Sequence, residues 1–169
     1  MKITNGERNI LLILVFTRPV TIKMKILIAF FFLHVLALPT WQSDLDTAKQ
    51  TATAEHKFIL LNFSGSDWCS GCIKMHKDIF ESTVFQGYAE DHLVLLNADF
   101  PRAKKNSLPP DLQKKNDALA DKYNSEGEFP LTVLLDSDGK VIKKWSGFYT
   151  KGPENFVNEI KQLDANSHN

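Results

Sequence analysis

Apolar residues follow two patterns along this chain, and each pattern predicts one kind of element. Dense apolar runs of strand length predict four strands, at 57–63, 92–100, 131–136 and 141–145. Helical spacing and a polar start predict helices at 43–55, 72–88, 111–123 and 153–163. Asp138-Gly139 between the last two strands predicts an antiparallel hairpin. We therefore expect an α/β fold with a mixed central sheet of about four strands and helices on both faces.

The first 40 residues differ from the rest of the chain. Thirteen residues at 26–38 are apolar except for His34. Lys23 and Lys25 precede this run and a polar segment follows it, which is the arrangement of a secretory signal peptide. The run is also too short to span a bilayer comfortably. These features predict a leader that directs export.

We therefore expect an N-terminal extension with a signal peptide at 1–40 and one folded domain at 41–169, which opens with the short helix. Met24 is a candidate for the true start, because a chain that begins there carries a compact signal. The protein would then be exported, and periplasmic or secreted. An N-terminal membrane anchor that is not cleaved is the alternative.

Charge and cysteine content exclude several classes of protein. The chain has 20 basic and 20 acidic residues, so its net charge is zero. Residues 41–169 alone hold 15 of the basic and 19 of the acidic residues, a net charge of −4. This balance argues against a nucleic-acid partner. Two cysteines are too few for a disulfide-rich scaffold or a four-cysteine zinc site.

The two cysteines, Cys69 and Cys72, lie three positions apart where a strand gives way to a helix. Unpaired N–H groups and the helix dipole stabilise a thiolate at such a position. We expect Cys69 to be exposed and to attack a substrate disulfide, and Cys72 to be shielded and to resolve the mixed disulfide. This redox-active pair would need no other cofactor.

Other roles for the cysteine pair stay open. A structural disulfide across two intervening residues removes little loop entropy and so stabilises little. His76 lies four residues after Cys72 and could share a helix face with both cysteines, as a three-ligand copper or zinc site. We expect redox chemistry and no bound metal. The rival functions are a metal- or haem-maturation module that uses the cysteines as ligands, and an interaction protein with incidental cysteines.

The segment Trp68-Cys69-Ser70-Gly71-Cys72 resembles the active site of the thioredoxin-like thiol-disulfide oxidoreductases, and the resemblance runs from about Leu45 to the C-terminus. Phe129-Pro130, Asp138-Gly139-Lys140 and Gly147 also match, and the chain looks most similar to secreted bacterial members. The resemblance implies a thioredoxin fold, reduction or isomerisation of protein disulfides, a monomer, protein thiol and disulfide substrates, and a membrane electron donor. Oxidation of protein thiols is the alternative within this class.

The resemblance also implies roles for residues outside the cysteine pair. Pro130 matches the proline that is cis and faces the cysteines, and Phe129 would present its backbone N–H and C=O to a substrate chain as an added strand. Trp68 would cover the site and contact substrate. Phe148 and Tyr149 are expected to add an aromatic contact near the site.

The chain departs from thioredoxins proper at several positions. Ser70-Gly71 replaces Gly-Pro between the cysteines. Asn62 takes the place of a buried Asp that accepts a proton from the resolving cysteine, and Leu95 that of its Lys partner. We therefore expect Cys72 to deprotonate less readily than in thioredoxin, while Asp67 receives no role.

One loop of the predicted domain is basic. The segment 101–110 carries Arg102, Lys104 and Lys105. Charged side chains in a loop are ordinarily solvated, and this is the default interpretation. Docking of an acidic surface of a partner is the alternative.

Overall fold

The computed structural model describes residues 40–167, with side chains to residue 165. The expected signal peptide and Met24 lie outside the described residues, so the expected boundary near residue 40 stays a prediction. Within the part of the chain that is described, no helix is both long and apolar enough to cross a membrane.

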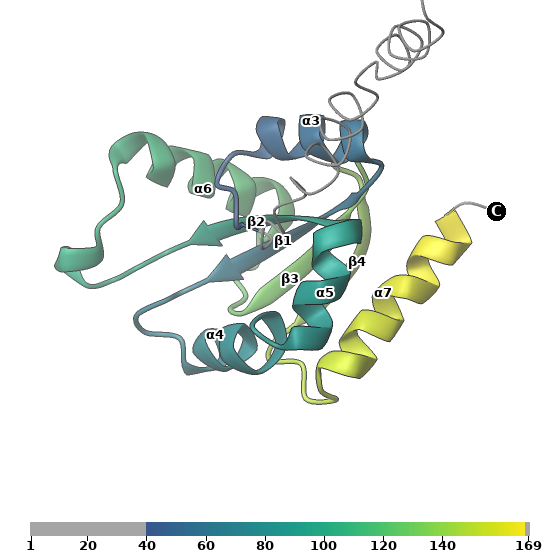
Figure 1. Cartoon of the computed structure of the whole chain (residues 1–169). Coiled ribbons are helices and arrows are strands. Elements are labelled where there is room, and N and C mark those ends of the chain that lie inside the picture. Colours follow the sequence, from purple (N-terminus) through teal and green to yellow (C-terminus); the bar gives the residue numbers. More distant parts are fainter. Residues whose placement is uncertain (1–39, 168–169) are drawn as a thin grey trace, which may run out of the picture. The chain divides into compact units, whose positions relative to one another are not determined.

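Four strands form one mixed sheet (Figure 1). They are β1 (Phe58–Ser64), β2 (Leu93–Asp99), β3 (Leu131–Leu135) and β4 (Val141–Ser146). The order across the sheet is β2-β1-β3-β4. β1 pairs with β2 in parallel and with β3 antiparallel, and β3 pairs antiparallel with β4. The predicted mixed sheet and the predicted hairpin are both confirmed.

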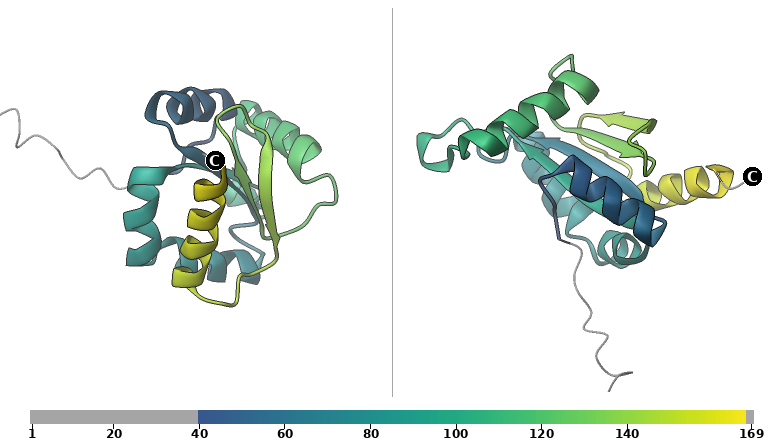
Figure 2. Two further views of the ribbon diagram at one scale, coloured as in Figure 1. Left: turned by 90° about the vertical axis from the view of Figure 1, so that its right-hand side faces the viewer. Right: turned by 90° about the horizontal axis from the view of Figure 1, so that it is seen from above.

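Helices cover both faces of this sheet (Figure 2). Alternate residues of β1 explain why, because Ile59, Leu61 and Phe63 face one apolar core and Leu60 faces the other. The helices on the first core are α3 (Leu45–Glu55) and α6 (Pro110–Tyr123). Those on the second core are α4 (Ser70–Met75), the π-helical turn η1 (His76–Phe80), α5 (Thr83–His92) and α7 (Pro153–Ser167).

The prediction of one helix over 72–88 is wrong, because the chain breaks near Ser82 into separate helices. The Ser82 hydroxyl donates to the Ile79 carbonyl oxygen at 2.7 Å and accepts from the Phe85 N–H at 3.2 Å, so it caps α5. Ile73 and Val84 are 51% and 42% exposed, although helical spacing placed both in the core.

Candidate functional site

The cysteine pair lies at the start of α4, directly after the loop that follows β1. Cys69 and Cys72 form a disulfide, and the Cys72 N–H donates to the Cys69 Sγ atom at 3.1 Å. The Gly65 N–H donates to the Cys72 Sγ atom at 3.5 Å. Cys69 is therefore the N-cap of α4, and a backbone donor points at each sulfur atom.

The expected exposure of Cys69 is wrong for this disulfide form. Its exposed fraction is 7%, against 3% for Cys72. Cys69 is the more exposed of the two, as the sequence predicts, but both cysteines are buried in the disulfide form.

Pro130 lies against the turn between the two cysteines. The Phe129–Pro130 peptide bond is cis, as the resemblance implies. A Cβ atom at Gly71 would lie 3.2 Å from the Pro130 Cδ atom, so glycine allows the close approach of α4 to this proline. The Gly147 N–H donates to the Pro130 carbonyl oxygen at 2.8 Å. The predicted contact of Phe129 and Pro130 with substrate stays a prediction.

Trp68 lies over the loop before the cysteines. Its Nε1–H donates to the Phe100 carbonyl oxygen at 2.7 Å, and its ring meets the Phe129 ring edge-on at 5.3 Å between centroids. A Cβ atom at Gly65 would overlap the Trp68 ring, so only glycine fits beneath it. The Arg102 guanidinium carbon lies 3.7 Å from the centre of the Trp68 ring. Trp68 is thus half-buried between a glycine and a cation.

Asp67, which the sequence left without a role, holds the basic loop against this site. Its carboxylate accepts from the backbone N–H groups of Arg102 and Ala103 and from the Asn106 side-chain amide, all at 2.9 Å. The Arg102 N–H is the largest cause of the lowered pKa of Asp67. The loop 101–106 is therefore part of the wall of the site.

Beneath α4 the sheet carries a neutral polar pair. The Asn62 Nδ2–H donates to the Asn97 Oδ1 atom at 3.1 Å, and the Thr132 hydroxyl donates to the Asn62 Oδ1 atom at 3.4 Å. Leu95 instead pairs with Leu60 in the apolar core. Asn97 was not predicted from the sequence, although it is a polar residue that interrupts the apolar run of β2.

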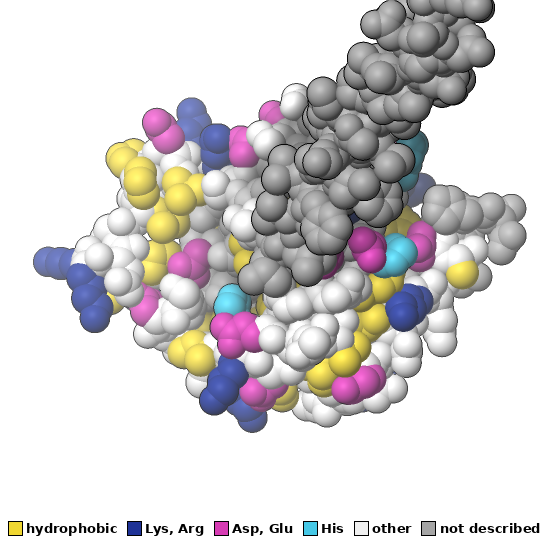
Figure 3. All heavy atoms as spheres, viewed as in Figure 1, with side chains coloured by type: hydrophobic (Ala, Val, Ile, Leu, Met, Phe, Trp, Pro, Cys, Tyr) yellow, Lys and Arg dark blue, Asp and Glu magenta, His cyan; other side chains and the backbone are white. Residues whose placement is uncertain are grey.

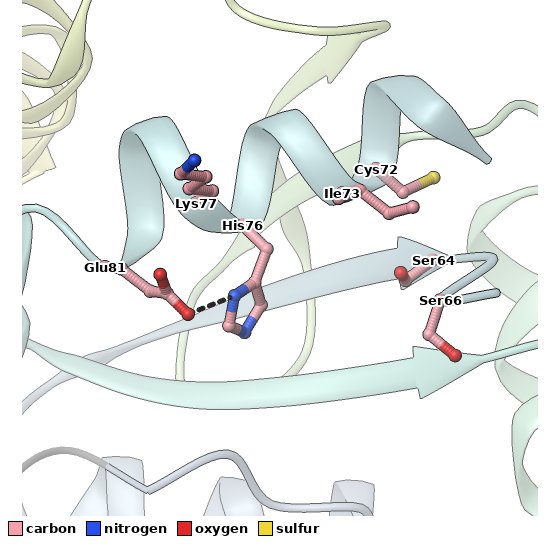
Figure 4. Close-up of a pocket in the computed structure, with 7 residues that line it drawn as sticks. All are labelled: Ser64, Ser66, Cys72, Ile73, His76, Lys77 and Glu81. Carbon is pink, nitrogen blue, oxygen red and sulfur yellow. Dashed lines mark ion pairs between the residues drawn. The ribbon is translucent and has the colours of Figure 1, made fainter.

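A cleft of about 420 Å³ opens beside Cys72 (Figure 4). It is lined by Ser64, Ser66, Cys72, Ile73, His76, Lys77 and Glu81. His76 turns toward the sheet, where its Nδ1 atom lies 3.1 Å from the Glu81 Oε1 atom. Within the described residues, no group of three His, Cys, Asp or Glu side chains is placed to hold a metal ion.

The expected placement of Tyr149 near the site is wrong. Tyr149 is buried against Phe156, and its hydroxyl donates to the Glu159 Oε1 atom at 2.7 Å. Burial is the main cause that raises the pKa of Tyr149 to about 12. Phe148 does lie beside α4, since the Lys74 Nζ atom is 4.9 Å from the centre of its ring. The two adjacent aromatic residues therefore lie in different regions, Phe148 beside α4 and Tyr149 against Phe156.

Residues 45–164 match the thioredoxin-like domain family. The chain belongs to this family. It is a thioredoxin-like thiol-disulfide oxidoreductase, and the expected fold is confirmed. Over 121 residues it is 37% identical to the disulfide bond reductase DsbH of Chlamydia pneumoniae, covering 72% of this chain and 70% of that protein.

Solved structures agree with this assignment. A DsbH oxidoreductase is 35% identical with a TM-score of 0.67, covering 75% of this chain and 85% of the other. A disulphide isomerase from Xylella fastidiosa Temecula1 is 20% identical with a TM-score of 0.51, covering 75% of this chain and 99% of the other. The second likeness concerns the fold alone.

Proposed function

We propose that this protein is an exported enzyme that reduces or isomerises disulfides in other proteins through Cys69 and Cys72. One observation carries the proposal: the cysteine pair is enclosed between Trp68 and cis-Pro130, with a backbone N–H directed at each sulfur atom. The similarity to a relative named as a disulfide bond reductase supports reduction as the main direction.

The reaction begins from the dithiol form. The Cys69 thiolate attacks one sulfur of a substrate disulfide, forms a mixed disulfide and releases the other substrate sulfur as a thiolate, which takes up a proton. Cys72 loses its proton and attacks the Cys69 sulfur, which releases the second substrate thiolate. The substrate has then gained two electrons, and the Cys69–Cys72 disulfide has formed.

Backbone donors can support both sulfur atoms during these steps. The N–H of Cys72 would stabilise the Cys69 thiolate before attack, because a hydrogen bond to a charged acceptor is stronger than one to a neutral acceptor. The N–H of Gly65 would do the same for Cys72. Asn62 carries no charge and is not a proton acceptor of the kind a carboxylate provides, so we expect Cys72 to deprotonate less readily than in thioredoxin.

Recognition of a substrate chain would use the rim of the site. The backbone of Phe129 would pair with an extended substrate segment, and Trp68 would pack on it. We also propose that a membrane protein returns electrons to the pair, because an oxidising compartment outside the cytoplasm would not. The protein would act there as a monomer, with no cofactor besides its disulfide.

Replacing Cys72 with Ala tests this proposal. Cys72→Ala should accumulate mixed disulfides with protein substrates, because Cys69 still attacks and nothing resolves the product. Cys69→Ala is the matched control and should trap none. If Cys72→Ala traps nothing, or if both variants lose a bound metal instead, the cysteines act as ligands or have no redox role.

A further inference from the structure

Arg102 contacts the aromatic residue that stands directly before the cysteine pair. Its guanidinium carbon lies 3.7 Å from the centre of the Trp68 ring, and Trp68 directly precedes Cys69. Arg102 is exposed and takes part in none of the ion pairs between described residues. A stacked arginine keeps the edge of its guanidinium group available for a carboxylate.

The position of Arg102 is fixed by its neighbours. The Asp67 carboxylate accepts from the backbone N–H groups of Arg102 and Ala103. At the base of the same loop, the Phe100 N–H donates to the Ser64 carbonyl oxygen at 2.8 Å, and the Phe100 carbonyl accepts from Trp68. Because these bonds already order the loop, binding of a ligand by Arg102 would cost little conformational entropy.

The loop also differs in charge from the rest of the domain. Lys104 and Lys105 follow Arg102 and are exposed, whereas residues 41–169 carry a net charge of −4. Figure 3 shows Lys and Arg side chains gathered at the left edge of the molecule, where the loop between β2 and α6 projects. A positive loop that contacts Trp68 favours the approach of acidic groups to this side of the site.

From these observations we infer that Arg102 is a specificity-determining residue, which selects substrate proteins with Asp or Glu next to the reactive cysteine. The guanidinium group would hold this carboxylate by two parallel hydrogen bonds while Cys69 attacks the adjacent sulfur. This inference rests on the proposed function, because it concerns the substrate of the same site.

The test uses two disulfide peptides that differ only in Glu or Gln beside the cysteine. The rate at which the reduced enzyme reduces each peptide is divided by the rate at which dithiothreitol alone reduces the same peptide. This ratio removes the effect that Glu itself has on the reactivity of the peptide disulfide. We expect a preference for Glu of about three- to fivefold at low salt, the size of a single exposed charge pair. It should fall toward one in high salt.

Variants of the loop assign this preference to one side chain. Arg102→Gln should abolish it, Arg102→Lys should keep part of it, and Lys105→Gln should leave most of it as the matched control. Equal rates for both peptides with the wild-type enzyme, or an unchanged preference in Arg102→Gln, would overturn the inference. Absence of exchange with either peptide is a separate result, which would overturn the proposed function together with the inference.

Discussion

Two polar centres lie on the same side of the sheet, one buried at Asn62 and one part-buried at Glu159, and they are satisfied in opposite ways. Beneath the disulfide, Asn62 and Asn97 bond to each other without any charge. Near the end of β4, the Glu159 carboxylate accepts from the Trp145 Nε1–H at 2.9 Å and from the Tyr149 hydroxyl at 2.7 Å. The Trp145 N–H is the main cause that lowers the pKa of Glu159.

The comparison of the two centres shows that a charged side chain is stabilised around Glu159 and not around Asn62. Lys151 also lies 3.3 Å from the Glu159 carboxylate, so donors surround that anion. A carboxylate in place of Asn62 would meet the Thr132 hydroxyl and the Asn97 amide oxygen, an acceptor, and no cation is among its bonded partners. A buried charge without such partners is costly, so the site beneath the cysteines is stable only when neutral.

The largest effect should come from adding a charge to the neutral centre. Asn62→Asp should lower the free energy of unfolding by about 3 kcal/mol at neutral pH, because a buried carboxylate replaces an amide donor. The loss should shrink as pH falls, since burial raises the pKa of the new carboxyl and keeps it protonated.

Urea unfolding at several pH values measures this effect. Asn158→Asp on the exposed face of α7 is the matched control and should change stability little. An Asn62→Asp variant as stable as the wild type at neutral pH would show that the centre tolerates a charge.

The second largest effect on stability should come from removing the Glu159 carboxylate. Glu159→Ala leaves the Trp145 N–H and the Tyr149 hydroxyl without their acceptor, which should cost about 2 kcal/mol in the free energy of unfolding. Asn158→Ala, on the same helix and exposed, is the control in the same urea experiment. Equal stability of the two variants would mean that Glu159 contributes no more than a surface residue.

The sequence predicted this contrast only in part. The apolar runs located all four strands, and the resemblance located Asn62, because both signals are local. The partner Asn97 and the donors of Glu159 depend on register and on the packing of α7, which no local pattern contains. For the same reason Tyr149 was expected beside the cysteines, although its hydroxyl donates to Glu159 of α7.

The contact between Trp68 and Arg102 shows the same limit. The sequence identified both residues separately, one beside the cysteines and one in a basic loop. Their contact depends on Asp67, whose bonds to the loop span 35 and 36 positions of the chain. The break at Ser82 was missed because the apolar spacing continues through it.

A carboxylate at a helix N-cap gives a smaller effect for comparison. Asp44 caps α3 by accepting from the Thr47 N–H at 2.8 Å, and the Lys115 Nζ atom lies 2.6 Å from its other oxygen. Asp44→Ala should cost about 1 kcal/mol in the free energy of unfolding, the usual value for an N-cap. Asp46→Ala, in the first turn of the same helix, should lower the free energy of unfolding by only a few tenths of a kcal/mol, as measured by thermal or urea unfolding. A larger loss in Asp46→Ala would assign the effect to the helix dipole.

The smallest expected effect is a pH dependence. Because the pKa of Glu159 is lowered in the folded protein, its contribution is complete above the ordinary pKa of a glutamate and is lost as pH falls through the lower folded value. Glu159→Gln should therefore flatten the acid side of the stability profile. Unchanged curvature below about pH 5 would contradict the assigned cause.

The equilibrium of the Cys69–Cys72 pair with glutathione tests the central proposal most directly. A protein-disulfide reductase should show one two-electron transition, with a potential nearer to about −270 mV than to about −120 mV. Loss of the transition in Cys69→Ala would assign it to this pair. A potential near the upper value would indicate an oxidase, and a pair that does not exchange with glutathione at all would contradict a redox function.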